Sequence, residues 1–246
     1  MQFLASLLSN LAYLNPMPLS GWLVWLGLAG LLGVALFNWR AYQPKLDSRA
    51  WGIFGALAFI TLITTFFIGV EISSGSTLPV PGLPEKPPGS TLMLFSAIPW
   101  TLAGGLLGPF AAAGLGILSG LLRATWDTHS LFIVLALSLL GVLFAVANRQ
   151  RYRTPLFGLL RQPLISALGL TAIHVVLFVL SAFFTVSTFA TVSERLDYAL
   201  SNTGVASLAF AGEMLIAGLV AQVIAMAFPL RWGGIGLLQP SPAEKS

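Results

Sequence analysis

The feature that most constrains this chain is a series of long apolar runs, separated by short gaps that hold most of its charges. Of its 246 residues, 57% are hydrophobic and only 8% are charged, whereas soluble domains carry about 25% charged residues. A chain so poor in charge cannot cover a surface that faces water. The runs approach the length of about 20 residues that a helix needs to cross a bilayer. The sequence therefore predicts an all-α, polytopic membrane bundle in which the lipid bilayer is the main partner.

Three regions are expected along the chain. Residues 1–20 include an apolar run, 2–14, that would span only about 20 Å as a helix, so an interfacial or partly inserted helix is predicted, and a true crossing stays open. Residues 21–232 form the transmembrane bundle, and residues 233–246 form a polar cytoplasmic tail or linker. About seven spans are predicted within the bundle, at 21–38, 51–70, 91–105, 107–123, 130–147, 165–188 and 205–229.

The gaps between the runs predict the orientation. With seven spans, the 39–50 gap, the 148–164 gap and the C-terminal tail lie on one side. These segments hold nine of the 12 Lys and Arg residues: Arg40, Lys45, Arg49, Arg149, Arg151, Arg153, Arg161, Arg231 and Lys245. Loops rich in Lys and Arg stay in the cytoplasm, so the C-terminus is expected there. The net charge of +4 follows from this bias and does not indicate nucleic acid binding.

The residue types present exclude several chemistries. The chain has no cysteine and only two histidines, which argues against disulfides, thiolate metal sites and iron–sulfur clusters. No nucleophile triad, phosphate-binding loop or pair of carboxylates is visible. We therefore predict no catalytic residue, no enzyme activity and no metal site, and the sequence defines no cofactor.

A stripe of small residues marks the predicted fourth span. Gly108, Ala112, Gly116 and Gly120 recur at every fourth position, which places them on one helix face. Small residues at this spacing let a neighbouring helix approach closely in a membrane. The stripe predicts packing within the bundle, and a sliding or homodimer interface is the alternative. Gly104, Gly105, Gly108 and Pro109 also predict a tight cytoplasmic turn between the third and fourth spans, where the stripe begins.

Charged residues at the outer side are the main candidates for a ligand site. Arg123 and Asp127 are four residues apart, so they can pair on one helix, and Trp126 and His129 lie beside them. The group either closes a helix end or contacts a ligand, with Arg123 binding an anion such as a carboxylate. Glu213 lies inside the last span, where an acid costs about 2.5–3.5 kcal/mol on insertion scales. We expect it to face protein and to pair with Arg123, or to be protonated and hydrogen-bonded.

Four further features are weighed in the same way. His174 in the sixth span shares a face with Thr171 and Ser181, and it either ligates a pigment, senses pH or packs in the core. The 71–90 connection contains five prolines and is either a lid over an outer pocket or a stiff loop. The basic run 148–153 can contact anionic lipid headgroups. The last group, Glu194, Arg195 and Asp197, is expected in a solvated outer loop.

The stretch around Arg123 resembles a known family. Gly108–Pro109, Ala112, Gly116, Ser119–Gly120–Leu121 and Arg123 resemble the membrane sensor region of bacterial histidine kinases of the LytS-type five-transmembrane group. They are also similar to sensor domains that precede GAF and kinase domains. Substrate-binding subunits of energy-coupling-factor vitamin transporters show similar patterns.

The resemblance implies a sensor module of the bacterial inner membrane that signals to a cytoplasmic output domain. No kinase, GAF or cyclase domain lies within these residues, so that output would lie on a removed segment or a separate polypeptide. Two alternatives stay open. One is the substrate-binding membrane subunit of a small-solute transporter that works with a transporter module. The other is a structural subunit of a larger membrane complex.

Overall fold

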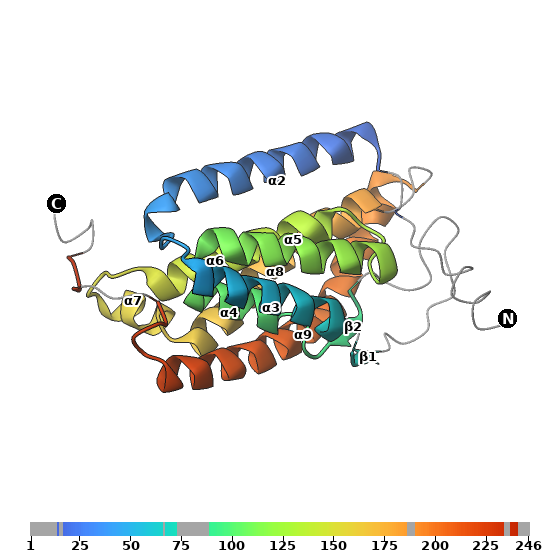
Figure 1. The fold of residues 1–246 in the computed structure, drawn as a ribbon. Helices are drawn as coiled ribbons and strands as arrows, with labels where there is room; N and C mark the ends of the chain where they lie inside the picture. Colours follow the sequence, from blue (N-terminus) through green and yellow to red (C-terminus); the bar gives the residue numbers. More distant parts are fainter. Residues whose placement is uncertain are drawn as a thin grey trace, which may run out of the picture.

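The computed structural model describes Leu14 and residues 17–65, 67–72, 89–185, 190–233 and 237–240. Apart from Leu14, the predicted helix at 2–14 lies outside these residues, and so do the prolines of the 71–90 connection. Helices dominate the described part (Figure 1). The elements are α2 (Leu19–Asn38), η1 (Arg40–Tyr42), α3 (Ser48–Thr64), β1 (Gly69–Glu71), β2 (Thr91–Met93), α4 (Ile98–Leu106), α5 (Pro109–Trp126), α6 (Phe132–Arg149), α7 (Pro155–Leu160), α8 (Pro163–Thr185) and α9 (Val192–Ala227).

Four of the described helices, α2, α6, α8 and α9, are long and apolar enough to cross a membrane. The shorter helix α3 is also apolar. Large apolar side chains point outward from these helices, and Val176 and Leu208 are 59% and 63% exposed. Such faces suit contact with acyl chains, because lipid tails are as apolar as leucine. The prediction of a mainly helical fold, with helices long and apolar enough to cross a membrane, is confirmed at this level.

The predicted third span, 91–105, is wrong as a single helix. Its first residues form β2, which pairs antiparallel with β1 so that Gly69 lies opposite Met93. Helix α4 begins only at Ile98, with Pro99 in its first turn, where the missing N–H of proline costs nothing. Its nine residues span only about 14 Å. The predicted second span, 51–70, is also too long, because α3 ends at Thr64 and the chain then enters β1.

Helix α9 is much longer than the predicted span 205–229. It begins at Val192 and has 36 residues, which is about 54 Å at 1.5 Å per residue. The acids and the arginine at 194–197, predicted in a loop, lie in its first turns instead. A capping box begins the helix: the Glu194 amide donates to Thr191 Oγ1 (3.3 Å), and the Thr191 amide donates to Glu194 Oε2 (2.7 Å). These bonds satisfy amides that would otherwise have no partner at a helix start.

The small-residue stripe packs α5 directly against α6. A Cβ atom placed on Gly116 would lie 2.7 Å from the Leu137 carbonyl oxygen, and one on Gly120 would lie 2.5 Å from Val134 Cα. On the facing helix, a Cβ on Gly141 would lie 2.9 Å from the Ala112 carbonyl oxygen. The two backbones therefore touch along the stripe, as predicted for packing inside the bundle.

Gly108 has a different role from the one the stripe predicted. It precedes α5 as its N-cap residue with φ of +103°, a conformation open to glycine but strained for other residues. A Cβ here would also lie 2.7 Å from Pro44 Cδ. The side chain of Gln43 crosses this turn: its Nε2 donates to the Leu107 carbonyl (3.0 Å) and its Oε1 accepts from the Phe110 amide (3.0 Å). The predicted tight turn is thus confirmed, and it is fixed by the loop after α2.

The three basic segments meet at the end of the bundle where α7 lies, and the β1–β2 hairpin lies at the opposite end (Figure 1). Buried Arg149 donates to the carbonyls of Gly104 (3.0 Å) and Gly105 (2.9 Å) at the end of α4. The Trp232 indole donates to Asn148 Oδ1 (3.2 Å). Further along the tail, the Gln239 amide donates to the Arg151 carbonyl (2.7 Å). We call the end of the bundle that holds residues 39–50, 148–164 and 228–233 the basic end. Residues 237–240 of the tail bond there to the loop between α6 and α7.

Candidate functional site

A buried group of three charges lies near the end of α5. Arg123 Nη1 donates to both carboxylate oxygens of Glu213 on α9, at 3.1 and 2.9 Å. Its Nε and Nη2 donate to Asp127 Oδ2 at 3.3 and 3.1 Å. The side chains of Arg123 and Glu213 are only 4% and 1% exposed. The predictions that Glu213 faces protein and pairs with Arg123, and that Arg123 pairs with Asp127, are confirmed.

The hairpin and the turn after it provide further partners of Glu213. The Met93 amide in β2 donates to Glu213 Oε1 (2.9 Å), and Ser96 Oγ, in the turn before α4, donates to Oε2 (3.3 Å). The side chain of Leu92 also fills the space over Gly212, so that a Cβ there would lie 2.9 Å from it. The departure from helix at residues 91–97 therefore has a role: extended backbone exposes an amide that a helix interior would have used itself.

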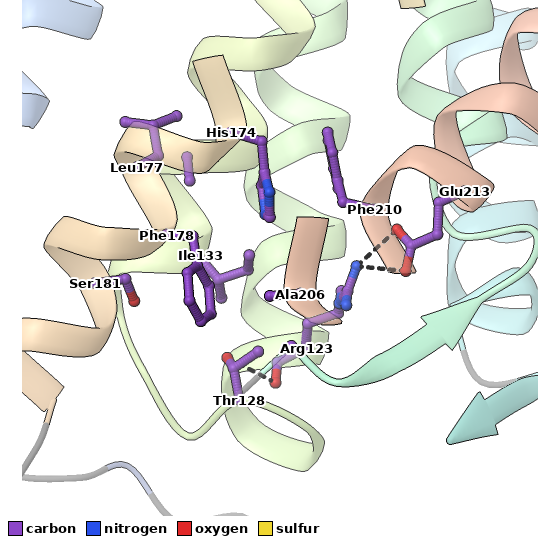
Figure 2. Close-up of a pocket in the computed structure, with 12 residues that line it drawn as sticks. Arg123, Thr128, Ile133, His174, Leu177, Phe178, Ser181, Ala206, Phe210 and Glu213 are labelled. Carbon is purple, nitrogen blue, oxygen red and sulfur yellow. Dashed lines mark hydrogen bonds and ion pairs between the residues drawn. The ribbon is translucent and has the colours of Figure 1, made fainter. Parts of the chain in front are cut away.

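A cavity of about 30 Å³ borders this charge cluster. That is room for one or two water-sized groups. Figure 2 shows two phenylalanines of its lining: Phe210 of α9 lies near the Arg123–Glu213 pair, and Phe178 of α8 lies farther from the pair, on the side of Ser181. Residues from α5, α6, α8, α9 and the loops line it: Gly89, Arg123, Thr128, Ile133, Ala136, His174, Leu177, Phe178, Ser181, Ala206, Phe210 and Glu213.

His174 lines the cavity from α8. Its imidazole is stacked on the ring of Phe210, with 3.9 Å between centroids and 10° between planes. The residue is 6% exposed, and its Nδ1 has no hydrogen-bond partner within the described residues. A buried polar atom without a partner costs free energy. The predicted packing role of His174 accounts for its ring face, which stacks on Phe210, but it leaves Nδ1 without a hydrogen-bond partner among the described residues.

The other predicted site residues are placed differently. Ser181 does line the cavity with His174, as their common face predicted. Trp126 is 47% exposed and does not line the cavity. Asp127 is not among the described residues that line the cavity, and it pairs with Arg123, which does line it. Each guanidinium nitrogen of Arg123 donates to Asp127 or Glu213, and the binding of an external carboxylate by Arg123 stays a prediction.

Sequence reasoning missed Met93, Ser96, Phe178 and Phe210. The hairpin residues were hidden because the apolar run around them was taken for a helix. Phe210 lies one turn before Glu213 on the same helix face, and this i, i+3 spacing is the signal that could have found it. Phe178 follows His174 at i+4 and could have been found in the same way.

The cavity has room for a small molecule beside the Arg123–Glu213 pair, the phenylalanine rings and His174. Among the described residues, no group of three or more His, Asp and Glu side chains could hold a metal ion. No protein-family model, curated protein or solved structure matches the chain, so its function has to be inferred from this cluster and its place in the fold.

Proposed function

We propose that the chain is a sensor module of a bacterial inner membrane, with about seven crossings and its C-terminus in the cytoplasm. A small solute enters the cavity beside Arg123 and Glu213, and α9 passes the change to a cytoplasmic output domain. The orientation rests on the positive-inside rule, since the basic end gathers Arg149, Arg151 and Arg231 with the other basic residues of the cytoplasmic gaps.

One observation carries the proposal: a single continuous helix joins the cavity to the basic end. Helix α9 holds Glu213 at the cavity. Just beyond its last residue, Ala227, the indole of Trp232 is bonded to Asn148 on α6. A rigid helix transmits a shift or rotation along its whole length. Any ligand that changes how Glu213 sits against Arg123 therefore also acts on the contacts of Trp232.

A ligand can drive that movement only by binding one arrangement of α9 more tightly than another. The ion pair provides two such arrangements, because its partners lie on different helices. With Glu213 held by Arg123, α9 is fixed to α5. With the pair weakened, Asp127 still holds Arg123, and the Glu213 side chain keeps its bonds to the Met93 amide and to Ser96 Oγ.

The cavity also bears on the two alternatives. A substrate-binding transport subunit would share a closed pocket of this kind, and it would co-purify with an ATPase-driven module. A structural subunit needs no pocket, so a cavity with an unpaired histidine nitrogen counts against it. Native mass spectrometry of the protein from mild detergent distinguishes a transport subunit from a sensor, because the transport subunit is expected to retain an ATPase and the sensor is not.

Spin-label distance measurements test the sensor proposal. The chain has no cysteine, so Cys placed at Leu159 and Leu230, which are 49% and 75% exposed, carry labels at the basic end. We expect Glu213→Gln to shift or broaden the distance distribution between them. The control is Asp197→Asn, the same change at an exposed site on the same helix, which should leave the distribution unaltered. Identical distributions for both variants and the parent would overturn the coupling.

A further inference from the structure

Positive charge at the basic end is almost unopposed within the chain. Among the described residues of this end, Asp47 is the only acid, and it caps α3. The described cations of the same segments are Arg40, Lys45, Arg49, Arg149, Arg151, Arg153, Arg161 and Arg231. No ion pair joins Arg40, Arg151 or Arg161 to a described carboxylate. The charge of this surface therefore favours an anionic partner from outside the described chain.

Two tyrosines bring the basic segments together. Tyr42 of η1 and Tyr152 of the loop after α6 interact through their hydroxyls: burial, and then the Tyr152 hydroxyl, raise the pKa of Tyr42 above its usual value. Arg161, just after α7, donates from Nη1 to the Tyr152 carbonyl (2.7 Å). Arg40 begins η1, two residues before Tyr42. Two guanidinium groups and two phenol hydroxyls therefore come from segments that meet at one junction.

Apolar side chains are exposed on the elements that carry these arginines. The Arg40 guanidinium lies 4.5 Å from the centroid of the Phe37 ring, in the last turn of α2, which is long and apolar enough to cross a membrane. Phe37 is 63% exposed, and so is Leu156 of α7. Figure 1 shows the end of α2 and α7 at the same end of the bundle. Exposed apolar groups beside cations are suited to the boundary between headgroups and acyl chains.

We propose that the headgroup of an anionic phospholipid binds at this junction, the Arg–Tyr site, which consists of Arg40, Tyr42, Tyr152 and Arg161. Both guanidinium groups donate to phosphate oxygens, because their planar fork of N–H groups matches phosphate geometry. The tyrosine hydroxyls provide further donors, and an acyl chain lies against Phe37. This inference goes beyond the sensor function and requires only that the basic end lies at a membrane surface.

The size of the effect separates such a site from the general attraction of anionic lipid to basic loops. General attraction changes affinity by about fivefold for each Lys or Arg near the surface, wherever that residue lies in the loops. A direct hydrogen bond from a guanidinium to phosphate is worth about tenfold or more, and only at the residue that makes it. Free phosphate has the same headgroup chemistry but no acyl chain to cover Phe37 and Leu156, so the exposed apolar groups favour the lipid.

Native mass spectrometry with added lipid tests the site. The protein in mild detergent is titrated with phosphatidylglycerol and with phosphatidylcholine of the same acyl chains. We expect tighter binding of phosphatidylglycerol, and a loss of about tenfold or more in Arg40→Gln and in Arg161→Gln. The matched control is Arg49→Gln, which removes the same charge from an exposed position at the same end and should cost about fivefold at most.

A second variant retains the charge. Arg40→Lys keeps the cation at an exposed position but loses the fork that binds phosphate through two parallel bonds, so phosphatidylglycerol affinity should fall between those of the parent and Arg40→Gln. Equal losses in Arg40→Gln and Arg49→Gln, or parent affinity in Arg40→Lys, would leave only general attraction and overturn the site. Equal binding of the two lipids would also overturn it.

Competition identifies the source of the phosphate. Sodium phosphate should displace phosphatidylglycerol no better than sodium chloride at equal ionic strength, and stronger displacement would assign the site to free phosphate and overturn the lipid. The result is independent of the sensor proposal. If phosphatidylglycerol binds as expected while Glu213→Gln leaves the spin-label distances unaltered, the sensor proposal fails and the lipid site stands. If the distances shift while the arginine variants bind lipid as the parent does, the reverse holds.

Discussion

Two buried arginines, one near each end of the bundle, are satisfied in opposite ways. Arg123 donates to two carboxylates, one of them on another helix. Arg149 donates to the carbonyls of Gly104 and Gly105, and no carboxylate among the described residues pairs with it. Carbonyls at a helix end carry partial negative charge that is fixed in place. The carboxylate of Glu213 can instead be neutralised by a proton, so under the proposed function we expect the cavity end to switch and the basic end to act as an anchor.

The largest effect on stability is expected from breaking the Arg123–Glu213 pair. Arg123→Met should lower the free energy of unfolding by about 3–5 kcal/mol, because it leaves the buried charges of Asp127 and Glu213 uncompensated. Unfolding by titration with a denaturing detergent measures the change. Arg195→Met, at the partly exposed start of α9, is the control and should cost much less.

A double variant sharpens this result. Arg123→Met with Glu213→Leu replaces both partners by apolar groups, which is often nearly neutral, although Asp127 still lacks its cation. The double variant should therefore recover part of the stability that Arg123→Met loses. Strictly additive losses would show that the two residues do not interact in the folded protein.

A smaller loss in the free energy of unfolding is expected from changing Arg149 at the basic end. Arg149→Met removes two hydrogen bonds from a charged donor and leaves the end of α4 unpaired, which should cost about 1.5–3 kcal/mol. The exposed Arg49→Met at the same end is the matched control. The same detergent titration measures both, and a loss for Arg149→Met no larger than that for Arg49→Met would contradict the role of Arg149 at the end of α4.

The smallest effect is expected where α5, which carries Arg123, packs against α6, which carries Arg149. Gly120→Ala places a Cβ 2.5 Å from Val134 Cα, so the helices must separate, at about 1–3 kcal/mol. Gly114→Ala is the control on the same helix, because its Cβ would lie 3.6 Å from the Phe54 ring. Similar melting temperatures for the two variants would show that the small-residue stripe does not set the helix separation.

Much of the helical bundle was accessible from the sequence, because apolar length is a strong signal in a membrane protein. The Arg123–Glu213 pair was also predictable, since a buried acid needs a partner and few cations lie on its side of the bundle. Gly116 and Gly120 were correctly assigned to packing by their spacing alone.

What the sequence did not reveal depends on contacts between distant segments. Thr91–Met93 belongs to an apolar run that resembles those of the predicted spans. It is held as a strand by its pairing with β1 and by the bond from the Met93 amide to Glu213. The predicted span was shorter than α9 because hydropathy alone excluded the charged residues of its first turns. Thr191 and Glu194 form a capping box, which marks the true start of the helix. The anchoring of Trp232 on Asn148 has no local signal at all.

The length of α9 has a further consequence in a bilayer. From Tyr198 to Ala227, Glu213 is the only charged residue, and this stretch is about 45 Å long, against a hydrocarbon thickness of about 30 Å. A helix longer than the bilayer is thick accommodates the mismatch by tilting. Thicker membranes should make α9 more upright and thinner ones should tilt it further, so the position of the basic end relative to the Arg123 pair depends on the surrounding lipid as well as on any solute.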